Sequence, residues 1–250
     1  MTINALLELF DEAMGVFIRD KRMWFRPAGI GKFARSQGGH LYDDPRDLRS
    51  ATINAVETSL LESMATEQGM VLQNLALATE AIGLGGFPNF ARHENSWFEA
   101  LKFRMCEMPA SRYLGAPRVL STIAGWLGRD PSVTFPLGLE REEAVLLRPF
   151  CPPYFPTMQK AVRAFVETKF GPSGSYRGGA EQSSWGDPKN CAAAVPAPGE
   201  PAIEATVAYC EYVHQRYGRF PACTAPFRTA IGFQVCHVDE EFYSRFYRPS

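Results

Sequence analysis

The chain has little of several features that mark particular classes of protein. Its 250 residues carry 26 basic and 27 acidic side chains, so no basic excess marks a surface for nucleic acid or an anionic membrane. No apolar run approaches the roughly 18 residues of a membrane span, and the N-terminus has early acidic residues without a basic leader. We therefore expect a cytoplasmic protein whose partners include neither nucleic acid nor a membrane.

Clusters of metal-binding and catalytic residues are also scarce. The six cysteines show no CxxC or CxH spacing in a chain too large to depend on disulfides, which indicates reduced thiols and no zinc site of paired ligands. Neither a G-x-S-x-G elbow nor a phosphate loop occurs, and carboxylates are not grouped as in glycosidases or nucleases. With 46% hydrophobic and 21% charged residues, the chain is typical of one globular domain spanning residues 1–250.

The longest helical pattern runs from Thr52 to Phe87. At about 100° per residue, one stripe collects its apolar side chains: Ile53, Val56, Leu60, Met64, Val71, Leu75, Ala78 and Ile82. Apolar residues also lie off the stripe in the second half, which predicts deep burial. Gly69 costs about 1 kcal/mol relative to alanine in a helix and suggests a closely packed neighbour. Glu67 lies within the stripe and is either a satisfied buried carboxylate or a group near a cofactor or subunit contact.

A glycine-rich exit, GLGG from Gly83 to Gly86, follows this pattern. Glycine accepts the left-handed conformation at a helix C-terminus, so the exit predicts the end of the helix. The alternative is that its backbone amides receive a ligand.

A run of residues across this helix and its exit resembles the central helix of the nitroreductase superfamily, most closely its branch of azoline-oxidising peptide dehydrogenases. The run comprises Glu67, Gly69, Gln73, Asn74, Leu75, Leu77, Ala78, Ala81, Gly83, Leu84 and Gly85. The resemblance implies an α+β fold with a central, mostly antiparallel sheet surrounded by helices and a long buried central helix. It also implies a homodimer with FMN at the subunit interface, with Gln73, Gly85 and Gly86 among the cofactor-binding residues.

The segment from Arg19 to Arg35 is basic and aromatic and is broken by a proline and two glycines. Its composition fits either a solvated loop or a loop that binds an anion. In the superfamily an arginine-rich segment at this place binds the FMN phosphate, which implies that role for Arg19, Lys21, Arg22 and Arg35. The usual Arg-Arg-Ser-x-Arg form is absent, and this keeps open a flavin-free protein of the same fold that binds a metabolite or a partner protein.

The loop that follows, with Ser36, Gly38 and Gly39, resembles the S-x-G-G-L-Y loop that lies along the flavin in the peptide-dehydrogenase branch. His40 is inserted after the two glycines. Because histidine titrates near neutrality, His40 is the candidate catalytic residue for delivering a proton, with a surface histidine as the alternative. His237 and Asp239 share one side of an extended segment. They form either a structural pair or, with His40, the metal site of a hydrolase.

Periodicity and turn residues predict the remaining elements. The predicted helices span 3–18, 93–105, 119–127, 159–170 and 201–217, and the predicted strands span 132–140, 144–147 and 229–238. Pro136 predicts an edge position or the end of its strand, and Cys151, in a proline-rich loop, is expected to be buried and inert. Residues 171–200 are loop-rich and predict either a functional lid or an arm that embraces a second subunit, with a mobile insertion as the equal alternative.

The function that the resemblance implies is hydride transfer between FMN and a small-molecule or peptide substrate. The reductant would be NAD(P)H, or the substrate itself if the enzyme is a dehydrogenase.

Overall fold

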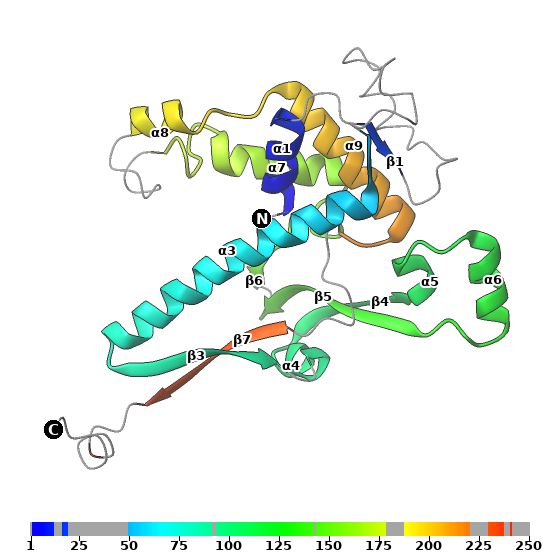
Figure 1. The fold of residues 1–250 in the computed structure, drawn as a ribbon, viewed down its shortest axis with the longest axis horizontal. Coiled ribbons are helices and arrows are strands. Elements are labelled where there is room, and N and C mark those ends of the chain that lie inside the picture. The colour runs from blue at the N-terminus through cyan, green and yellow to red at the C-terminus, as the bar shows by residue number, and fades with distance from the viewer. Residues whose placement is uncertain are drawn as a thin grey trace.

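The structure, a computed structural model, describes residues 2–12, 17–19, 50–91, 94–142, 144–178, 188–220, 230–237 and 241. Over these ranges the fold is α+β, with eight helices and a three-stranded antiparallel sheet as its largest sheet. Figure 1 shows three helices, α1, α7 and α9, above the strands β3 to β7, with the long helix α3 running diagonally between the two layers. The predicted α+β class is confirmed, but the described strands are divided among three small sheets and do not form one central sheet.

Helix α3, Ile53–Ala81, begins and ends where the sequence predicts. Thr52 caps its N-terminus, because the side-chain oxygen Oγ1 accepts a hydrogen bond from the Ala55 amide at 3.1 Å. At the other end Gly83 adopts a φ of 76°, the left-handed conformation that stops the helix. The residues after it do not form a loop, because β3, Leu84–Ala91, begins immediately and pairs antiparallel with β7, Ala230–His237.

The apolar stripe of α3 is buried in the first half of the helix and exposed in the second half. Ile53, Val56 and Leu60 belong to the core, whereas five large apolar side chains from residue 70 onward are between 43% and 70% exposed: Met70, Val71, Leu75, Leu77 and Ile82. The predicted deep burial of the second half is therefore wrong for this single chain, because the upper helices reach only the first half (Figure 1). The close neighbour predicted at Gly69 is also absent, since a Cβ placed there meets nothing within 4 Å among the described residues.

The main core lies between α1, Thr2–Glu12, α7, Met158–Phe170, and α9, Glu200–Tyr217. Its fully buried side chains include Leu6, Phe10, Val162 and Tyr209, in line with the helical periodicity of the three segments. One detail differs from prediction. The first helix, predicted over residues 3–18, ends at Glu12, before the short parallel pair β1, Phe17–Arg19, and β2, Ser50–Thr52.

The three-stranded sheet has the order β4, Phe103–Pro109, then β5, Ser132–Arg141, then β6, Ala144–Leu147. The predicted strands 132–140 and 144–147 are confirmed, and they pair as an antiparallel hairpin. Pro136 lies within β5, the central strand, opposite Met105 and beside a register shift. It is tolerated because β6 pairs only with Leu139 to Arg141, so among the described residues no strand lies on the other side of Pro136.

The helix predicted over 93–105 is shorter in the structure. Helix α4, Glu94–Ala100, stops before Lys102, whose φ of 60° breaks the helix, and Phe103 to Met105 pair with β5 instead. Between β4 and β5 the chain makes an excursion through α5, Ala110–Tyr113, and α6, Arg118–Trp126, which confirms the helix predicted over 119–127. We call residues 110–131 the finger. Of the described helices, none combines the length and apolar character that a membrane crossing requires.

Candidate functional site

Many of the sequence-predicted site residues lie outside the part of the chain that the structure describes. These are Lys21, Arg22, Arg35, Ser36, Gly38, Gly39 and His40. Arg19 is the last residue of β1, and its backbone pairs with Thr52 at the start of α3. Gln73, Gly85 and Gly86 are placed on the second half of α3 and on the strand that follows.

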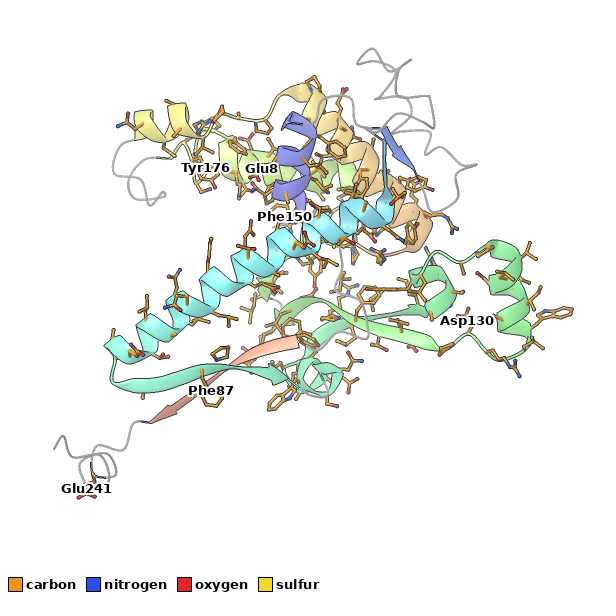
Figure 2. All side chains as sticks on the ribbon, viewed as in Figure 1. Glu8, Phe87, Asp130, Phe150, Tyr176 and Glu241 are labelled. Carbon is orange, nitrogen blue, oxygen red and sulfur yellow. The ribbon has the colours of Figure 1, made fainter. Side chains whose placement is uncertain are left out.

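Gln73 lies on a face of α3 that combines amide and apolar side chains. Met70, Gln73, Asn74 and Leu77 are spaced by three and four residues, which brings them onto one side of the helix, and all four are exposed. Figure 2 shows the side chains on this half of α3 standing clear of the upper helices. We call these four residues the amide face, and its composition offers both apolar contact and hydrogen bonds to a planar polar molecule.

Gly85 and Gly86 do not form the open glycine loop that the sequence allowed. They lie in β3, half-buried, opposite Cys236 and Val235 of β7.

Only part of the metal site proposed from the sequence lies within the described residues. His237 is the last residue of β7, opposite Leu84, whereas Asp239 and His40 lie outside the described residues. Among the residues that are described, no group of three or more histidine, cysteine, aspartate or glutamate side chains is close enough to hold a metal ion.

A buried ion pair that the sequence analysis missed joins α3 to the end of α9. Arg219 Nη1 lies 2.7 Å from Glu57 Oε1, and Arg219 Nη2 donates to Glu57 Oε2 at 3.0 Å. The guanidinium also donates through Nε to the Tyr113 carbonyl at 3.2 Å and lies over the rings of Tyr113 and Tyr217. With side chains 8% and 16% exposed, the pair is largely removed from solvent. It is a structural link, and its separation of 162 residues leaves no local signal in the sequence.

The titration properties of two other buried groups point to structural roles. Cys151 is 1% exposed, and burial raises the pKa of its thiol to about 12, which confirms the predicted inert cysteine. Tyr209 lies close to the ion pair, and its pKa is raised chiefly by burial and then by the negative charge of Glu57. Neither group is available as an acid or base near neutral pH.

The loop-rich segment at residues 171–200 is tied down at both ends. Arg177 Nη2 donates to the Val195 carbonyl at 3.0 Å, which joins the turn after α7 to the exit of the short helix α8, Pro188–Ala194. Lys169 Nζ donates to Asn4 Oδ1 at 2.8 Å and lies over the Tyr176 ring, which fixes the turn against α1. Residues 179–187, the centre of the predicted lid, lie outside the described residues.

Comparison with known proteins finds no match: no family model, no curated protein and no solved structure matches this chain. The resemblance to the nitroreductase superfamily stays a prediction that rests on the residues quoted above.

Proposed function

We propose that the protein is a homodimeric, FMN-dependent oxidoreductase of nitroreductase type. One observation carries this proposal. The run of residues that resembles the superfamily, Glu67 to Gly85, coincides with the half of α3 and the start of β3 that the chain's own helices leave uncovered. A helix that contacts both a second subunit and a cofactor needs a surface that its own chain leaves uncovered. On α3 that surface carries the residues that resemble the superfamily.

The open surface of α3 has two sides with different chemistry. On one side Val71, Leu75, Ala78 and Ile82 continue the stripe that Ile53 begins, and we call these four residues the seam. The seam is exposed and carries no charge. Exposure of such an apolar surface to water is unfavourable, so the seam is expected to be covered by a second subunit.

On the other side the amide face fits the chemistry of a flavin ring. Met70 and Leu77 supply apolar contact, and Gln73 and Asn74 supply amide donors and acceptors for the polar edge of the ring. FMN, when bound, accepts and returns a hydride, and the protein sets the orientation of the ring and of the substrate. The substrate would be a small molecule or a peptide, with NAD(P)H as reductant unless the substrate itself is oxidised.

The first test is whether the protein binds FMN. Freshly purified protein should absorb in the visible range, or should become yellow on reconstitution with FMN and gain thermal stability in its presence. A colourless protein that FMN neither colours nor stabilises would refute the proposal. Strong stabilisation by a different metabolite would then favour a flavin-free protein of this fold.

A matched pair of variants tests the amide face. Gln73→Ala removes one or two hydrogen bonds to the ring and should weaken FMN binding by about 3- to 10-fold. Gln68→Ala changes the same kind of exposed side chain on α3 but off the amide face, and it should leave the affinity unchanged. Equal affinities for the two variants, measured by fluorescence titration, would place the flavin elsewhere.

A further inference from the structure

The finger carries a second uncovered apolar surface. On α6 and its C-cap, five large apolar side chains follow a helical spacing that places them on one side: Val119, Leu120, Ile123, Trp126 and Leu127. They are between 50% and 92% exposed, with Trp126 the most exposed. An uncharged surface of this kind on a helix is typical of an interface with another protein.

The base of the finger is held in place, so this surface is not a loose end of the chain. The Ser111 amide and hydroxyl donate to the two carboxylate oxygens of Asp130 at 2.8 and 2.5 Å. Arg216, near the end of α9, donates through Nη2 to the carbonyls of Gly115 and Ala116 at 3.2 and 3.3 Å. The finger is therefore anchored to the helical layer while α6 presents its apolar side outward.

The finger and the uncovered half of α3 have opposite charges. The finger holds three arginines and one aspartate, a net charge of +2, whereas residues 65–83 hold Glu67 and Glu80 and no basic residue, a net charge of −2. Glu67, four residues before Val71, lies at the edge of the seam, whereas Glu80, seven residues after Gln73, lies on the side of the amide face. Arg129 is exposed on the finger. The finger and the edge of the seam thus carry opposite charges, which favours one register of docking.

These two surfaces cannot meet within one chain. Figure 1 places α6 and the C-terminal end of α3 at opposite ends of the molecule. In a twofold dimer, however, a surface at one end of each subunit can contact the surface at the other end of its partner, and that contact then forms twice.

The geometry points to a second copy of this chain as the occupant: we infer that the finger of each subunit docks on the seam of its partner. This inference rests on the homodimer of the proposed function and names the surfaces that form it. The five finger side chains present on the order of 100 Å² each, so two fingers and the two α3 segments that they cover bury about 2,000 Å². That total lies at the lower end of the range of obligate homodimers.

A charge-swap experiment tests the inference. Arg129→Glu, and separately Glu67→Arg, place like charges together and should each weaken dimerisation about tenfold. Combining both substitutions should return the dissociation constant to within about threefold of the wild type. Lys160→Glu, an exposed charge change on α7, serves as the control and should have no effect. Sedimentation velocity measures each dissociation constant, and circular dichroism checks that each variant is folded.

Cross-linking gives a second readout that does not depend on the stability of the dimer. A copy with Trp126→Cys should form a disulfide with a differently tagged copy with Leu75→Cys, whereas pairing Trp126→Cys with Lys160→Cys should not. A wild-type dimer that tolerates both charge reversals and gives no such cross-link would overturn the inference and leave the proposed function standing. A wild-type protein that is monomeric at all concentrations would overturn the inference and the proposed homodimer together, while the FMN measurements would still decide the cofactor.

Discussion

The buried pair of Glu57 and Arg219 allows the sharpest test of how this fold is held together. We expect Glu57→Gln and Arg219→Met each to destabilise the protein strongly, because each leaves a charged or polar partner buried without its counterpart. In contrast, the double variant Glu57→Leu with Arg219→Met removes both charges, so no charged group is left without a counterpart. It should be close to the wild type in stability, since the desolvation cost of two charges is removed together with their attraction.

The expected size follows from the enclosure of the pair. With the side chains 8% and 16% exposed and two close contacts at 2.7 and 3.0 Å, the pair belongs to the buried class. Removing one partner of such a pair costs about 3 to 5 kcal/mol. In a domain of this length that corresponds to a fall in Tm of roughly 6 to 20 °C.

Urea unfolding followed by circular dichroism, at one fixed protein concentration, measures these differences. The exposed pair of Arg163 and Glu200, with side chains 46% and 56% exposed, supplies a matched control, and Glu200→Gln should cost no more than about 1 kcal/mol. Single variants at Glu57 and Arg219 that unfold within about 1 kcal/mol of the wild type would refute the reasoning.

Three further predictions concern packing, pH and thiol chemistry. Gly115→Ala should cost about 3 kcal/mol or more in urea unfolding, because φ is +67° and its Cβ would clash with the Tyr217 ring. Gly128→Ala is the control, because Gly128 has a similar φ of +62° but a Cβ there would meet nothing within 4 Å. If Gly128→Ala lowered the free energy of unfolding as much as Gly115→Ala, the packing argument would be contradicted. His214 has a pKa lowered chiefly by burial, so the unfolded chain binds its proton first and stability should fall as the pH drops below about 6.5. The fall between pH 7.5 and 5.5 should be smaller in His214→Gln, and equal falls would exclude His214 as the cause. Cys151 should resist alkylation at pH 8 in the folded protein and react after unfolding, and peptide mass mapping that finds it modified first would contradict its raised pKa of about 12.

Individual helices, strands and turns could be predicted from the sequence because each depends on residues that are close together in the chain. Helical spacing placed α7 and α9 within a residue of their observed ends, and the left-handed preference of glycine placed the end of α3 at Gly83. The strands β5 and β6 were predicted from their composition on either side of a short turn.

The candidate site was only partly predictable. Gln73 was identified from the resemblance, and its exposed position beside Asn74 is compatible with contact to a ligand. Gly85 and Gly86 were expected in an open loop after the helix, but they lie in a strand. The strand forms by pairing with β7, about 150 residues later in the chain, and the residues near the glycines give no sign of this pairing.

The sequence by itself determined which segments are helices, which carry an apolar stripe, and which residues resemble a family, since these depend on neighbours a few positions apart. Only the tertiary structure decided which stripes are covered. The stripe of α3 is continuous from Ile53 to Ile82, yet its own chain covers only the first half, because coverage depends on where α1, α7 and α9 lie in space. For the same reason the pairing of Glu57 with Arg219 required the fold, which brings together two charges that the sequence keeps 162 residues apart.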